Sequence, residues 1–88
     1  MNDHDKYLVL RVLASATRFK IMKVLAKHKQ IDVTGIKDAL GMTHSAVSHQ
    51  LAQMSGYKVV EAKKAGRRMV YKFASGPAGS YARKIMRA

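Results

Sequence analysis

The chain has 88 residues, and its 17 lysines and arginines against 5 acidic residues give a formal net charge of +12 and an isoelectric point near 10.4. It contains no cysteine, which excludes disulfides, thiolate metal sites and thiol-based redox sensing. This length predicts one domain with a core small enough to gain from a dimer interface, and this charge suits a polyanionic partner, although a basic surface can also serve solubility alone.

Two helices are predicted at the start of the chain. The first covers residues 5–14, with Asp5 as its N-cap and an apolar side that includes Leu8 and Val12. Ser15 interrupts the pattern, and the second helix covers residues 16–28 with a wide apolar face, as expected for the central helix of a small core. The apolar residues of that face are Phe19, Ile21, Met22, Val24 and Leu25.

A helix-turn-helix is predicted over residues 33–54. Asp32 is a good N-cap for its short first helix, and Gly41 supplies the left-handed conformation that ends that helix. Thr43 caps a second helix that runs to about Met54, so a turn of three residues joins the two helices as the motif requires.

A basic β-hairpin is predicted over residues 59–73, where the apolar period changes from 3.6 to 2 around Ala65-Gly66. Four cations, Lys63, Lys64, Arg67 and Arg68, cluster at its tip. They can reach the DNA backbone or the adjacent minor groove, where they would add affinity more than specificity. The alternative is a solvated tip, but natural turns usually mix charges of both signs.

The last helix is predicted over residues 78–88, after Gly76-Pro77. It has a narrow apolar stripe with almost nothing in its own chain to cover it, formed by Tyr81, Ala82, Ile85 and Met86. Such a stripe on a terminal helix is most simply a subunit interface.

The second helix of the helix-turn-helix has two contrasting sides. Val47, Leu51 and Met54 fall together and must face the core. The opposite side carries no charge and consists of Ser45, Ser48, His49, Ala52 and Gln53. Short hydrogen-bonding side chains let a helix approach base edges in the major groove, whereas a solvated face usually carries Lys or Glu. Thr43 and His44, at the helix start, are predicted to contact phosphate or the first base.

Catalytic and metal sites are not expected. His44 and His49 are five residues apart, about 140° around a helix, so they cannot chelate one ion. Asp3, His4 and Asp5 lack a second ligand cluster, and no nucleophile lies near an assured base. We therefore predict a protein that is not an enzyme and has no cofactor and no metal.

Three segments carry a family resemblance: LASATRFKIM at residues 13–22, LGMTHSAVSHQL at 40–51 and VVEAKKAGRRMVYKF at 59–73. Over residues 8–73 the chain resembles the ArsR/SmtB family of bacterial and archaeal regulators. The resemblance implies an α+β winged helix-turn-helix of about five helices plus a two-stranded wing, and a homodimer formed by the first and last helices. The predicted dimer contacts are Leu8, Val12, Tyr81 and Ile85.

The chain also departs from that family. Cysteines of metal-sensing members fall here on Asp32 and Thr34, and residues 76–88 contain no Asp or His of the other common metal site. Lys58 replaces a usual glycine before the first wing strand, so the preceding helix is expected to end differently.

These observations predict that residues 1–88 form a single domain that binds double-stranded DNA sequence-specifically as a transcriptional regulator, a repressor. The alternatives are a nucleic-acid binder without sequence preference, either chromatin-like or RNA-binding, and a protein-interaction module. No apolar run is long enough to span a bilayer, and the acidic start does not resemble a secretory signal, so we expect a cytoplasmic protein without a membrane partner.

Overall fold

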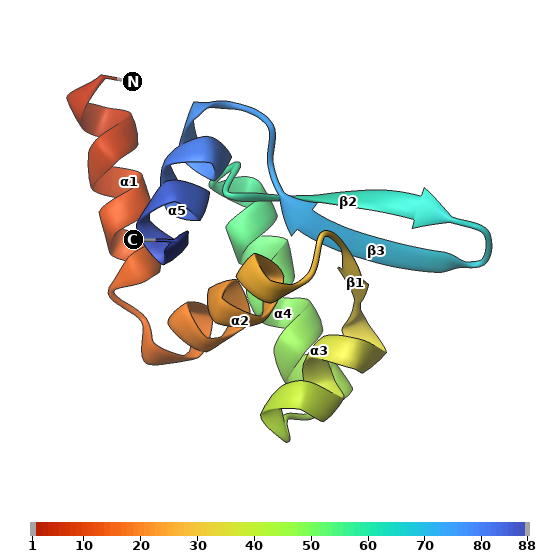
Figure 1. Cartoon of the computed structure of the whole chain (residues 1–88). Helices are drawn as coiled ribbons and strands as arrows, with labels where there is room; N and C mark the ends of the chain where they lie inside the picture. Colours follow the sequence, from red (N-terminus) through yellow and green to blue (C-terminus); the bar gives the residue numbers. More distant parts are fainter. Residues whose placement is uncertain (1, 88) are drawn as a thin grey trace.

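A computed structural model describes residues 2–87 and shows five helices and three strands over that range (Figure 1). In chain order they are α1 (Asp3–Leu13), α2 (Ala16–Lys27), β1 (Ile31–Asp32), α3 (Val33–Leu40), α4 (His44–Gly56), β2 (Val60–Ala65), β3 (Arg68–Phe73) and α5 (Pro77–Arg87). The helices gather on one side, and the β2–β3 hairpin projects from them as a wing (Figure 1). The α+β winged helix-turn-helix fold is confirmed.

The sheet has three antiparallel strands in the order β1-β3-β2, instead of the two predicted. In the additional strand, Ile31 pairs with Tyr71 and Asp32 with Val70. A strand of two residues is too short to show an alternating pattern in the sequence, and its partner lies far along the chain. The pairing attaches the base of the wing to the start of α3.

The hairpin itself is confirmed. Ala65 pairs with Arg68, so Gly66 and Arg67 form the connecting loop. Gly66 has a φ of 65°, in the left-handed region that a glycine adopts without steric cost.

The core lies between α2, α4 and the inner faces of α1 and α5. Its fully buried side chains include Ile21 and Met22 of α2 and Leu51 of α4. Phe19, predicted on the apolar face of the second helix, is instead 45% exposed. Phe19 lies at one edge of the apolar face of α2, whose centre is occupied by the buried residues Ile21, Met22, Val24 and Leu25. When an apolar face is this wide, helical spacing does not define which of its two edges is buried.

Side chains cap the helix starts. Asp32 Oδ1 accepts a hydrogen bond from the Gly35 backbone N–H at 2.8 Å, as the predicted cap of α3 should. At α1 the prediction of Asp5 is wrong, because Asn2 is the cap and its Oδ1 accepts from the Asp5 N–H at 2.8 Å. Both residue types make good caps, and the apolar pattern that would distinguish them begins only at Leu8.

Gly35, in the first turn of α3, has a steric explanation. A Cβ at this position would lie 2.7 Å from Ile31 Cγ1 and 3.2 Å from Asp32 Oδ1. A larger residue here would require the Ile31 side chain to move, which favours glycine at this position despite the entropic cost of a glycine in a helix.

The last helix differs from its prediction in where it begins and in how much of its apolar stripe is buried. It begins at Pro77, where a proline suits a first helical turn, and its predicted end at residue 88 lies outside the described residues. Ala82 is fully buried and Met86 packs against the core, so their own chain covers this half of the predicted interface stripe. Tyr81 and Ile85 stay exposed.

Gly79 sets how closely α5 approaches the end of β3. An added Cβ would overlap the backbone of Ala74. We expect Gly79→Ala to lower the free energy of unfolding by about 1–3 kcal/mol, because a rigid backbone cannot move away as a side chain can.

Gly76→Ala is the matched control, since nothing lies within 4 Å of a Cβ added there. Urea unfolding of both variants measures the effect, with a change under about 0.5 kcal/mol expected for the control. Equal stabilities of the two variants would contradict the close approach of α5 to Ala74.

Candidate nucleic-acid interface

The turn before α4 sets the direction of that helix. Gly41 has a φ of 65° and ends α3, and Thr43 Oγ1 accepts from the Ala46 N–H at 3.1 Å to start α4. Val47, Leu51 and Met54 are fully buried, as their spacing predicts. Burial of this side turns the opposite side of α4 outward.

The predicted reading residues lie on that outward side. Ser45, His49 and Gln53 are exposed, and Ser48 is half-buried. Thr43 and His44 are also exposed at the N-terminus of the helix, although the Thr43 hydroxyl already caps it. The structure thus brings six of the predicted contact residues together along one helix.

Arg18 of α2 is a residue of this surface that the sequence did not reveal. Its Nε donates to Gln50 Oε1 at 2.9 Å, and a terminal guanidinium nitrogen donates to Gln53 Oε1 at 2.6 Å. Its guanidinium carbon also lies 5.9 Å from the centre of the Tyr57 ring, within cation–π range.

These contacts of Arg18, called the Arg18 clamp below, define which hydrogen-bonding groups of Gln53 remain available to a partner. Because its carbonyl oxygen accepts from Arg18, its amide NH₂ group is the part that remains as a donor. Arg18 is separated from its partners by more than thirty residues, so no local pattern predicts the contact. The only sequence signal is the spacing of Gln50, Gln53 and Tyr57, which places them on one stripe that runs along α4 to its C-cap residue, Tyr57.

The wing holds the second group of predicted contacts. Lys63, Lys64 and Arg67 are exposed on the projecting hairpin (Figure 1). Arg68 is different, because its guanidinium forms an ion pair with Asp32 Oδ2 at 3.1 Å. An exposed pair of this kind contributes about 0–1 kcal/mol, and here it directs one wing cation back toward the start of α3.

Exposed apolar side chains mark a third surface, on α1 and α5. Tyr7 and Leu10 of α1 are 56% and 55% exposed, and Tyr81 and Ile85 of α5 are 37% and 36% exposed. Val12, one of the predicted dimer contacts, is fully buried in the core of its own chain and offers no surface to a second copy. Leu8 is half-buried. Helical spacing showed that α1 has an apolar face, but only packing decides which residues on it stay outside.

Residues 2–87 were compared with the requirements of a metal cluster and of a membrane-spanning helix. No three His, Asp or Glu side chains in this range lie close enough together to hold one metal ion. The absence of a metal partner remains a prediction. None of the helices in the same range is long and apolar enough to cross a membrane.

Comparison with known families decides the class of protein. The family model described as "Bacterial regulatory protein, arsR family" matches residues 15–61, which contain the second helix, the helix-turn-helix and the first part of the wing. The chain belongs to the arsR family.

Two curated relatives support this membership. The chain is 39% identical over 62 residues to the HTH-type transcriptional regulator NmtR of Mycobacterium tuberculosis, covering 70% of this chain and 51% of the relative. It is 35% identical over 71 residues to the transcriptional repressor PagR of Bacillus anthracis, covering 81% and 71%. The chain thus spans about half the length of NmtR.

Solved structures of the family share the architecture. The crystal structure of PagR superposes with a TM-score of 0.83 at 31% identity, covering 96% of this chain and 91% of that one. The homodimeric winged helix-turn-helix DNA-binding domain Mb0332 of Mycobacterium bovis has a TM-score of 0.81 at 25% identity, covering 99% and 82%. The arsR family consists of transcriptional regulators and not of enzymes, and this chain has the winged helix-turn-helix fold of its relatives.

The Arg18 clamp should make a measurable contribution to the free energy of unfolding. We expect Arg18→Met to lower the free energy of unfolding by about 1 kcal/mol, because two hydrogen bonds are removed while an unbranched apolar stem is kept. Lys20→Met, an exposed position on the same helix, is the control and should change little. In double-mutant cycles of Arg18→Met with Gln50→Ala and with Gln53→Ala, couplings near zero in both would show that the clamp's hydrogen bonds contribute nothing to stability.

Proposed function

We propose that this chain is a homodimeric repressor that binds double-stranded DNA sequence-specifically, with α4 in the major groove and the wing on the adjacent minor groove or backbone. The exposed, uncharged face of α4 carries this proposal, because the buried stripe behind it leaves that face no other orientation. Repression is supported by the similarity to PagR, which is itself a transcriptional repressor.

The side chains on α4 suit base reading. Ser45 and Ser48 are short, so the helix backbone can approach the floor of the groove, and His49 can donate or accept a hydrogen bond. Gln53, held by Arg18, presents its amide NH₂ group toward acceptors such as base N7 or O6 atoms or a phosphate oxygen. We assign sequence discrimination to these four residues.

The flanking groups supply affinity. Lys63, Lys64 and Arg67 on the wing carry positive charge to the sugar-phosphate backbone, where releasing counterions favours binding. Thr43 and His44 lie at the N-terminus of α4, whose backbone amides attract a phosphate oxygen. Arg68 contributes less in this proposal, because its ion pair with Asp32 directs it toward the start of α3.

A dimer would place two copies of α4 in successive major grooves about 34 Å apart. Tyr7, Leu10, Tyr81 and Ile85 form the proposed interface, with Leu8 at its edge. The similar domain Mb0332 is homodimeric, which supports this assembly. The proposal includes neither a metal nor a membrane, and it locates the regulator in the cytoplasm with the chromosome.

Base-reading and backbone contacts should respond differently to substitution. A duplex selected from a random pool serves as the cognate site. On it, Ser48→Ala and His49→Ala should each weaken binding by about 1–3 kcal/mol, with little change on random DNA, because a hydrogen bond to a base edge exists only on the cognate sequence. Fluorescence anisotropy at a series of salt concentrations measures the affinity of each variant for the cognate duplex and for random DNA.

The wing variants Lys63→Gln and Arg67→Gln are the comparison. Each should weaken binding to both duplexes alike and reduce the slope of log K against log salt by about one for each phosphate that the variant no longer neutralises. Equal losses on random DNA for the α4 and wing variants would contradict the assigned roles. Failure of the wild type to prefer any selected duplex by about a thousandfold would favour a nucleic-acid binder without sequence preference.

The dimer is tested by placing charge in its interface. Leu10→Glu combined with Ile85→Glu should yield a monomer in sedimentation equilibrium, because two carboxylates per subunit would be buried without partners. Cognate DNA affinity should fall at least about a hundredfold, since each monomer then engages one half-site alone.

Met69→Glu makes the same type of change at a 44% exposed position on the wing and should remain dimeric. A wild-type chain that sediments as a monomer at micromolar concentration would refute the dimer independently of any variant.

A further inference from the structure

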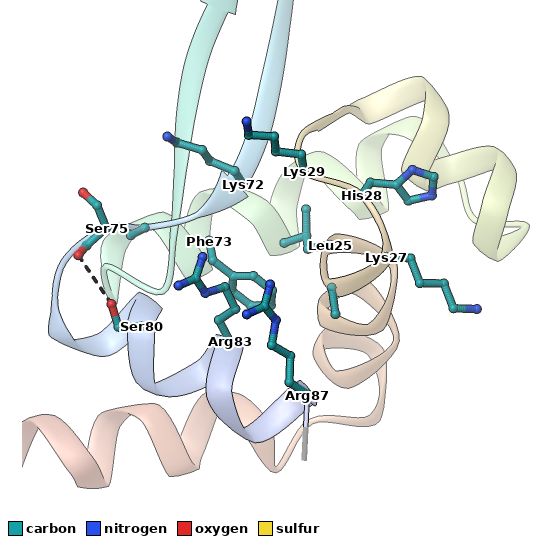
Figure 2. Close-up of a pocket in the computed structure, with 12 residues that line it drawn as sticks. Leu25, Lys27, His28, Lys29, Lys72, Phe73, Ser75, Ser80, Arg83 and Arg87 are labelled. Carbon is teal, nitrogen blue, oxygen red and sulfur yellow. Dashed lines mark hydrogen bonds between the residues drawn. The ribbon is translucent and has the colours of Figure 1, made fainter.

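A cavity of about 550 Å³ lies away from the proposed DNA-reading helix, and the proposed function assigns it no role. Its lining residues come from the end of α2 and the segment after it, from the end of β3 and the segment after it, and from one side of α5 (Figure 2). Its volume is within the range of small-ligand sites in proteins.

The lining is strongly basic. Its ionisable residues are Lys27, His28, Lys29, Lys72, Arg83 and Arg87, and the described lining includes no carboxylate. Glu61 approaches only the rim, with its Oε1 at 3.7 Å from Lys72 Nζ. Positive groups gathered around one hollow repel one another, and a bound anion would relieve that repulsion.

The side chains are arranged around an apolar floor. Figure 2 shows Arg83 and Arg87 extending from α5 on one side of Phe73, with Lys29 and Lys72 on its other side in this view. Leu25, which is 3% exposed, adds to the floor beside Phe73. The side chains of Lys27 and His28 extend away from the arginine pair in the same view.

We propose that this cavity binds a small organic polyphosphate, of the nucleoside diphosphate or triphosphate class, and that binding regulates the repressor. The two guanidinium groups offer paired donors that match phosphate oxygens, and the two lysines supply further charge for a second phosphate. The half-buried Phe73 ring provides an apolar surface on which a planar base can stack. A lone inorganic anion would leave that surface unused.

The cavity remains accessible in the proposed dimer. On α5, Arg83 and Arg87 are one turn apart and line the cavity, whereas Tyr81 and Ile85 share a different side of the helix. The core-facing Ala82 lies between these two sides. One helix can therefore contact a second copy of the chain and a ligand at the same time.

The regulatory half of the inference rests on the proposed function. A ligand in this cavity would connect the last strand of the wing to the proposed dimer helix and would add several negative charges to each subunit. Both effects act on DNA binding, and added negative charge opposes the attraction to phosphate. The ligand should therefore lower affinity for the selected duplex.

Ligand binding is tested first without DNA, by isothermal titration of the whole chain with ADP, inorganic pyrophosphate and adenosine at about 150 mM salt. ADP should bind saturably and more tightly than pyrophosphate, and adenosine weakly. Arg83→Gln with Arg87→Gln should weaken ADP binding at least about tenfold. Lys20→Gln with Lys23→Gln removes the same charge from exposed positions outside the cavity and should change it less than about twofold.

A second double variant, Arg83→Lys with Arg87→Lys, controls for a folding defect in the glutamine variant, because it keeps both charges and removes only the planar guanidinium groups. It should also weaken ADP binding. Absence of saturable ADP binding would overturn the proposal, as would equal losses in the cavity and control variants. ADP and pyrophosphate binding with equal affinity would overturn the role of Phe73.

DNA-binding measurements with and without ADP distinguish failure of the proposed ligand site from failure of the proposed repressor function. Without ADP, the cavity variant should bind the selected duplex within about twofold of the charge-matched control. With ADP, only the wild type and the control should lose DNA affinity. If the cavity variant loses DNA affinity as the wing variants do, these cations contact DNA, and the ligand site is refuted although the repressor stands.

Discussion

The packing of α4 against the core determines the rest of the proposed DNA-binding surface. Val47, Leu51 and Met54 are fully buried, and together with α2 they fill the centre of a small domain. A helix with one side locked in this way cannot rotate without exposing that side, at a cost of about 1.5–3 kcal/mol for each large apolar residue. The outward orientation of Ser45 and His49 is therefore a consequence of hydrophobic burial on the opposite side.

Two polar residues join the elements that this packing brings close. Asp32 caps α3 with one carboxylate oxygen and accepts a hydrogen bond from the Arg68 guanidinium with the other. Its backbone lies opposite Val70 in the β1–β3 pairing. Arg18 holds two glutamines of α4. The helix-turn-helix is thus tied to the wing on one side and to the central helix on the other, so the proposed DNA contacts belong to one connected unit.

The last helix, α5, has different surroundings on three of its sides. Its buried side reaches the core through Gly79 and Ala82, its exposed apolar side carries Tyr81 and Ile85, and Arg83 and Arg87 line a basic cavity. Three sides of one helix thus serve the core, the proposed dimer and the proposed ligand site. An event at one of these sides has a short physical path to the others, because a packed helix shifts as a unit.

Local sequence chemistry determined most of the fold. The bounds of α3, its Asp32 cap, the left-handed Gly41, the Thr43 cap and the hairpin around Gly66 all follow from neighbouring residues, whose conformational preferences act over a few positions. The two sides of α4 also follow from helical spacing alone. Only the tertiary structure decided the pairing of Ile31 with Tyr71, the clamp of Arg18 on Gln50 and Gln53, the capture of Arg68, and the burial of Val12 and Ala82. These contacts join residues that are distant in sequence, and their energies depend on which surfaces meet after packing, so they leave no periodic or local signature in the chain.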